Sequence, residues 1–270
     1  MFQGCTSLKY PPLLPDPVKN ECYRDMFSGC TSLTIAPALP ATTLAVSCYY
    51  NMFDNCSLLT TAPELPATTL ADNCYLFMFF GCTSLRTAPT LPATTLAHNC
   101  YKSMFAGCKK LQNAPTLPAT TLTKDCYTGM FSGCTSLTTA PVLPATTLDD
   151  YCYANMFYGC TSLVIAPELP ATTLINSCYF QMFRGCTSLV AAPILPATTL
   201  AERCYSQMFD NCTSLNYIKM LATNISAPNC LSDWVSDVAS TGTFIKHPDT
   251  KILTGTSGIP NGWTVETIDI

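Results

Sequence analysis

A 26-residue unit recurs eight times along this chain without an insertion or a gap. Its register is marked by a Met-Phe pair that begins at Met26, Met52, Met78, Met104, Met130, Met156, Met182 and Met208. The unit reads M-F-x-G-C-T-S-L-x-x-A-P-x-L-P-A-T-T-L-A-x-x-C-Y-x-x. A fixed period of this length predicts a repeat solenoid, in which each unit buries its apolar side only against its neighbours. Such an architecture favours an extended binding surface over a single catalytic pocket.

The repeat divides the chain into two parts. We expect a repeat array over residues 1–217 and a C-terminal segment over residues 218–270, which is an α+β cap or a small module. Met1 falls on the Met position of the repeat, so we expect a fragment without an N-terminal capping unit, whose uncapped end could pair with another chain. No leader is visible, because the N-terminus has neither a basic stretch nor a long apolar stretch.

Apolar spacing in the C-terminal segment predicts one helix and three short strands. Leu231, Trp234, Val235 and Val238 are spaced as on one helix face, and we expect strands near residues 242–246, 251–255 and 263–270. The segment is interpreted as a cap that shields the end of the array. The alternative is a recognition module with Trp234 and Trp263 as anchors, but buried tryptophans more often serve packing.

The composition argues against nucleic-acid binding and membrane insertion. Charged residues make up only 11% of the chain and the net charge is −4, without a cluster of Lys and Arg. No basic surface for nucleic acid or anionic lipid is therefore expected. No apolar run approaches the roughly 18–20 residues that span a bilayer.

Within one unit, we expect a short strand, a Pro-rich corner and a short helix. Cys48 and Met52 are four residues apart, as are Tyr49 and Phe53, which predicts two adjacent strips on a helix over residues 45–56. The Gly or Asn that follows each Phe by two residues is a typical helix stop. The strand is expected around residues 33–36, and the prolines after it end ladder pairing.

Seventeen of the 18 cysteines lie in two periodic columns. Members of the two columns are eight residues apart across each predicted helix, too far for a disulfide within the unit. A disulfide ladder between units stays an alternative. We favour buried thiols that pack as small apolar groups. The chain lacks C-x-x-C spacing and has only two histidines, so no metal site is predicted.

The unit resembles the BspA-type leucine-rich repeats of bacterial surface proteins. The matching residues in one unit are Leu33, Ala36, Leu39, Pro40, Leu44, Phe53, Cys56 and Leu59. The unit departs from the family pattern in its greater length, its Ala-Pro pair and its second Cys. The resemblance implies a leucine-rich-repeat-like solenoid of α/β coils and a cell-surface or secreted recognition or adhesion role, with host or matrix proteins or glycans as partners. It carries over no catalytic residue.

Function is expected at the positions that vary between units. Two variable positions follow the strand Leu and a third lies between the prolines, and together they predict one continuous ligand-binding face. We call this the strand-side stripe, formed by Glu64, Arg86, Thr90, Gln112, Asn113, Thr116 and Glu168. The alternative is ordinary solvated surface.

Two further surface features are candidates. The aromatic patch consists of Tyr50, Leu76, Phe77 and Phe80. It is interpreted as packing between coils, with an interaction site as the alternative. A Thr-Thr pair recurs from residues 42–43 to residues 198–199 and could suit ice binding, although we expect its hydroxyls to bond backbone groups.

An enzyme would need several converging reactive groups. The chain offers two histidines, sparse carboxylates and no Gly-rich phosphate loop, so we predict no catalytic residues and no cofactor. The sequence therefore favours a non-enzymatic binding or adhesion protein. The alternative is a structural spacer or stalk of a larger surface or phage-tail protein.

Overall fold

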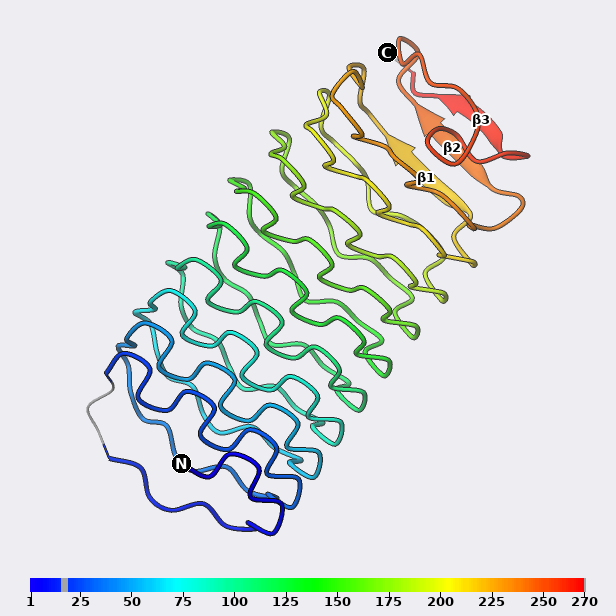
Figure 1. Ribbon diagram of the computed structural model, residues 1–270. Coiled ribbons are helices and arrows are strands. Elements are labelled where there is room, and N and C mark those ends of the chain that lie inside the picture. Colours follow the sequence, from blue (N-terminus) through cyan, green and yellow to red (C-terminus); the bar gives the residue numbers. More distant parts are fainter. Residues whose placement is uncertain (16–18, 270) are drawn as a thin grey trace.

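The chain winds into a solenoid whose coils stack one on the next from the N-terminal to the C-terminal end (Figure 1). The computed structural model describes residues 1–15 and 19–269. Each repeat makes one coil, so equivalent residues in successive units lie side by side. This confirms the repeat solenoid that the 26-residue period predicts.

One side of each coil is a run of overlapping β-turns, which we call the turn segment, residues 45–56 and their equivalents one period apart. In this run alternate N–H groups bond the carbonyl three residues back, as Met52 does with Tyr49 at 3.3 Å. The intervening N–H groups reach the next coil, and the Phe53 N–H donates to the Met78 carbonyl at 2.9 Å. Both alternating sets of backbone N–H groups are therefore hydrogen-bonded without a helix.

The predicted short helix is wrong: among the described residues the structure contains no helix. Every fourth residue of the turn segment has a positive φ, for example Ser47 at 52°, Asn51 at 56° and Asn55 at 56°. Type II turns require this conformation at their third residue. The turn run repeats every four residues, so Cys48 and Met52 share a buried strip, as residues four apart would on a helix.

Far-UV circular dichroism should show this difference directly. We expect the spectrum of the native protein to lack the double minimum of helices, because its turn segments bond three residues back or between coils. A helical spectrum that is lost on unfolding would contradict the turn segments. The expectation concerns the secondary structure of the array alone and needs no ligand.

The opposite side of the coil, the strand side, carries a narrow parallel ladder. One residue per coil pairs with its equivalent in the next, in the series Thr61, Thr87, Asn113, Thr139, Ile165, Ala191 and Tyr217. The ladder widens at the C-terminal end into a parallel sheet in the order β1-β2-β3. These strands are β1 (Tyr217–Met220), β2 (Thr243–Lys246) and β3 (Thr264–Thr267). The strand predicted in each unit is thus reduced to a single bridged residue in most coils.

Two columns of stacked rings run through the core. One column is formed by the Phe of each Met-Phe pair, where neighbouring rings such as Phe105 and Phe131 lie 5.8 Å apart and almost parallel. The other is formed by the Tyr that follows each second Cys, and Tyr101 and Tyr127 are likewise 5.8 Å apart. Both columns end on Trp234, which contacts Tyr205 and Phe209. The rings make every coil depend on its neighbours.

Sixteen of the 18 cysteines are buried as free thiols, while Cys5 and Cys22 are exposed. In the column that follows the Gly or Asn position, each thiol from Cys30 onward donates to the carbonyl of a Phe 28 or 29 residues earlier, as Cys134 does with Phe105 at 3.2 Å. The buried-thiol interpretation is therefore confirmed. The thiol gives Cys one contact that Ala lacks: it adds a second donor to a buried carbonyl of the preceding coil, which already accepts a backbone N–H.

The C-terminal segment continues the stacking. Tyr217 pairs with Thr243, one period later, and Thr243 pairs with Thr264. The predicted helix near Trp234 is wrong, because Asn229 and Asp233 take positive φ and the stretch forms another turn segment. The strands near residues 242–246 and 263–270 are confirmed as β2 and β3, with Ile270 outside the described residues, whereas residues 251–255 form only an isolated bridge at Thr254. The division into two domains stays a prediction.

Candidate functional site

All residues of the strand-side stripe are exposed. The bridge ladder from Thr61 to Tyr217 holds successive coils in register, so Thr90 and Thr116 occupy equivalent places in neighbouring coils. Asn113 itself belongs to the ladder. The structure therefore brings the stripe residues together as a surface, while their role in binding stays a prediction.

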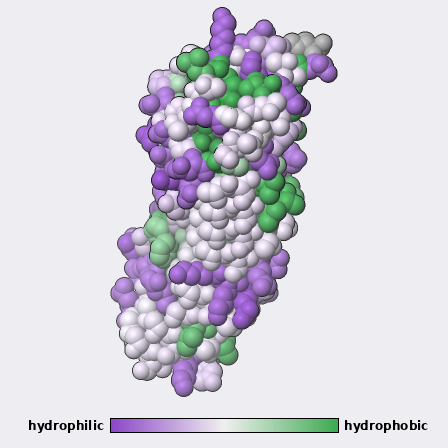
Figure 2. Space-filling view, turned by 90° about the vertical axis from the view of Figure 1, so that its right-hand side faces the viewer, coloured by the Kyte–Doolittle hydropathy of each residue, from purple (hydrophilic) through white to green (hydrophobic). Residues whose placement is uncertain are grey.

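The same face carries an aliphatic patch that the sequence analysis did not select. Its residues and exposed fractions are Val142 81%, Val164 45%, Ile165 71%, Val190 44% and Ile194 45%. Earlier coils carry mostly polar residues at these positions, for example Thr60, Thr61 and Glu64. Aligning the repeats and comparing the columns would have revealed this change. Figure 2 shows one side of the molecule, where apolar surface lies in separate patches, more of them toward the C-terminal end.

Glu168 is the one stripe residue inside the aliphatic patch. It lies in the coil between those of Val142 and Ile194, at the equivalent position. Beside this patch is a shallow groove of about 270 Å³, lined by the proline corners of two coils together with Thr116 and Val142. The region of the aliphatic patch thus combines exposed aliphatic side chains, one carboxylate and an apolar groove.

The aromatic patch lies on the turn segments. Tyr50 and Phe77, from adjacent coils, meet edge to face with ring centroids 6.1 Å apart. Phe77 and Phe80 meet in the same way at 5.7 Å. Packing between coils is therefore part of its role, yet Phe80 stays 39% exposed. Leu76 is buried and contributes little surface.

The Thr-Thr pairs do not use their hydroxyls as expected. All residues of these pairs, from Thr42 to Thr199, are exposed, and none of their hydroxyls bonds a backbone group within the described residues. The expectation that the hydroxyls satisfy backbone groups is therefore wrong. The backbone does this instead, as the Leu44 N–H donates to the Thr69 carbonyl at 2.9 Å. The side chains form two regular rows on the surface.

An ion pair lies in a surface groove near the C-terminal end of the array. Arg184 Nε lies 2.7 Å from Asp210 Oδ2, and the groove around them has a volume of about 560 Å³. Burial raises the pKa of the Asp210 carboxyl, and the Arg184 guanidinium opposes this shift. Because each charge already has its partner, the pair is a structural contact between coils rather than a reactive centre.

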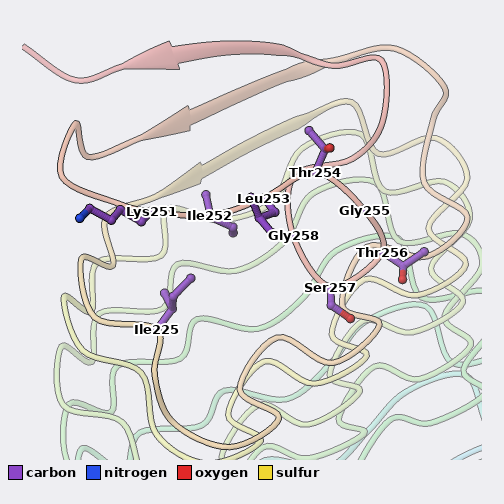
Figure 3. Close-up of a pocket in the computed structure, with 9 residues that line it drawn as sticks. All are labelled: Ile225, Lys251, Ile252, Leu253, Thr254, Gly255, Thr256, Ser257 and Gly258. Atoms are coloured by element: carbon purple, nitrogen blue, oxygen red, sulfur yellow. The ribbon is translucent and has the colours of Figure 1, made fainter.

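The C-terminal segment holds a third groove, of about 530 Å³ (Figure 3). Ile225 lies on one wall, and Ile252 and Leu253 lie on the facing segment. The loop of residues 254–258 borders it and is tied to the turn segment by the Val235 N–H, which donates to the Thr256 carbonyl at 3.1 Å. Its lining combines three aliphatic side chains with Thr, Ser and Gly residues and one Lys, and it offers no converging acid and base.

The described part of the chain holds no group of three or more His, Cys, Asp and Glu side chains that could bind a metal ion. Within the same residues, no helix is long and apolar enough to cross a bilayer. The surfaces that remain are the strand-side stripe with its aliphatic patch, the aromatic patch and the three grooves.

This architecture defines a repeat solenoid of parallel coils that presents extended faces rather than a pocket. The family described as "BspA type Leucine rich repeat region" matches the chain in six copies, over residues 1–138, 49–165 and 150–231. The chain therefore belongs to the BspA-type leucine-rich repeat family. Proteins of this family are usually bacterial surface or secreted proteins and are typically non-enzymatic. Neither the curated proteins nor the solved structures contain a match to it.

Proposed function

We propose that this chain is a non-enzymatic binding protein of the cell surface or the secreted fraction, and that its strand side recognises a protein ligand. The aliphatic patch carries the proposal. At these exposed positions Thr satisfies the fold in other coils, so Val142 and Ile165 are not needed for packing. Exposed apolar patches rimmed by polar residues mark interaction sites.

The chemistry of the face indicates which ligand fits. Val142, Ile165 and Ile194 would contact apolar side chains of the ligand, which binding would remove from water. Glu168, set among them, would favour a Lys or Arg of the ligand, because a carboxylate without an opposite charge is poorly solvated in an interface. The polar half of the stripe, with Arg86 and Gln112, would extend the contact along the array.

Replacing the aliphatic patch by threonine tests the proposal. We expect Val142→Thr, Ile165→Thr and Ile194→Thr together to weaken binding to immobilised collagen, laminin or fibronectin by tenfold or more, about 1.4 kcal/mol. Surface plasmon resonance measures the change. Ile35→Thr is the matched control, because Ile35 is 57% exposed at the position equivalent to Ile165 and lies outside the patch.

Two other results would redirect the proposal. Equal binding by the wild type and the triple variant would move the ligand site away from the patch. No binding to any of these proteins would favour the alternative function, a rigid spacer or stalk, which the two uninterrupted ring columns would suit. Ice binding through the exposed Thr-Thr rows is the third candidate, and a thermal-hysteresis measurement on the wild type tests it.

A further inference from the structure

The aromatic patch contains a residue in an unfavourable backbone conformation. Phe77 has a φ of 57°, in the left-handed region that bulky side chains seldom adopt. This conformation costs about 1–2 kcal/mol for a residue with a side chain. At the equivalent position the other coils carry Asp25, Asn51, Ser103, Gly129, Asn155, Gln181, Gln207 and Asp233. The chain thus places a large ring where it otherwise uses small or polar residues.

Core packing does not explain this ring. Phe77 is only half-buried, and its ring meets edge to face the rings of Tyr50 and Phe80, which themselves reach the surface. At the position of Phe80 the other coils carry side chains of several sizes, from Ser28 and Ala106 to Tyr158. Strain kept at a surface position points to a functional site.

Fixed polar groups lie in the coils directly before these rings. Asp54, equivalent to Phe80 one coil earlier, accepts from Ser28 Oγ at 3.1 Å and from Asn55 Nδ2 at 2.9 Å. Asn51, equivalent to Phe77, donates through Nδ2 to Asp25 Oδ1 at 2.6 Å. These bonds hold the carboxylates and amides in place, while each carboxylate keeps free lone pairs.

The local charge disfavours an anionic ligand. Arg24 lies over the Tyr50 ring at 4.6 Å, and it also pairs with Glu21 at 3.6 Å and Asp25 at 3.4 Å. Glu21, Asp25 and Asp54 contribute three negative charges and Arg24 one positive charge, so the patch carries a local charge of about −2. This charge repels anionic groups such as sulfate or sialic acid.

We propose that Tyr50, Phe77 and Phe80, together with Asp54 and Asn51, form a binding site for a neutral oligosaccharide. The negative faces of the rings attract the C–H groups of a pyranose, and the fixed carboxylate and amide groups bond its hydroxyls. The site lies on the turn segments and not on the strand side. The test of this site is therefore independent of the test of the proposed protein ligand.

The test uses substitutions that the fold already accepts. Phe77→Asn and Phe80→Ser introduce residues found at the equivalent positions Asn51 and Ser28. Phe77→Asn also relieves the strain at positive φ, so the double variant should unfold at the same temperature as the wild type or higher. Tyr158→Ser is the matched control, because Tyr158 is 40% exposed at the position equivalent to Phe80.

Calorimetric titration with neutral hexasaccharides (β-1,4-glucan, β-1,3-glucan, mannan and chitin fragments) provides the readout, with heparin as the anionic comparison. We expect the wild type and Tyr158→Ser to bind at least one neutral hexasaccharide and not heparin. The double variant should lose that binding tenfold or more while its melting temperature is kept. Absence of neutral-sugar binding, binding that the double variant retains, or binding of heparin alone would overturn the site.

Discussion

The array should unfold cooperatively when the pH is raised to between about 9 and 10, because its core holds sixteen thiols that must stay protonated. Burial raises the pKa of Cys48, Cys126 and Cys212 to about 12, and it raises the pKa of the other buried thiols as well. It also raises the pKa of Tyr101 and Tyr127 well above the usual range.

The direction of the effect follows from proton binding. The folded state holds these thiol protons more tightly than the unfolded chain, whose thiols have a pKa of about 8.5. The stability they contribute is complete below that pH and is lost as the pH rises toward the folded pKa values. Above that pH, the stability contributed by each buried thiol falls by about 1.4 kcal/mol per pH unit. The summed loss from the sixteen buried thiols therefore exceeds a typical folding stability of roughly 5–15 kcal/mol within one pH unit.

Circular dichroism and tyrosine absorbance across a pH titration would measure this transition, with reductant present and with recovery at pH 7 as the reversibility control. Retention of the native spectrum at pH 11 would contradict the prediction. At pH 7, a thiol reagent should modify Cys5 and Cys22 quickly and the sixteen buried thiols only after denaturation. Rapid modification of all cysteines in the native protein would equally count against a thiol-filled core.

The second large effect is expected at the centre of the Phe column. Phe131→Ala should lower the free energy of unfolding by about 3–5 kcal/mol, because it leaves a cavity in a fully buried position. The substitution also removes two ring contacts, with Phe105 and Phe157, both at 5.8 Å. Each such contact is worth about 0.5–1.5 kcal/mol beyond burial.

Urea unfolding of Phe131→Ala, followed by circular dichroism and tyrosine fluorescence, would measure the loss. Stability in a solenoid is a sum over neighbouring coils, so a weakened central coil should also separate the transitions of the two halves. Phe80→Ala is the matched control, because the same side chain is 39% exposed there and its removal should cost about 1 kcal/mol or less. Equal losses in the two variants would argue against a continuous Phe column.

The repeat predicted the buried residues more reliably than the backbone that carries them. Cys48 and Met52 were placed on one buried strip from their spacing, and both are buried. The helix inferred from the same spacing is wrong, because a run of type II turns also repeats every four residues. A second pattern distinguishes a run of type II turns from a helix. Ser47, Asn51 and Asn55 lie four residues apart at positions of positive φ, which type II turns require and a helix does not contain.

The candidate site shows a similar division. Exposure of Arg86 and Gln112 followed from their place after the strand Leu, and that of Glu64 from its place between the prolines; the structure confirms that exposure. The sequence did not reveal that Val142 and Ile165 form an exposed patch. An apolar residue at a variable position can belong to the core as readily as to the surface. The strain at Phe77 was also hidden, since a residue type does not state its φ.

The sequence by itself determined that this protein is a stack of equal coils with one layer of Leu, Phe, Tyr, Met and Cys per coil. A single 26-residue unit cannot bury its apolar side alone, so it buries that side by stacking against the neighbouring units. Only the tertiary structure decided how the backbone of each coil is satisfied. The Phe53 N–H finds its acceptor in the Met78 carbonyl of the next coil, and the turn conformation depends on that neighbour being present.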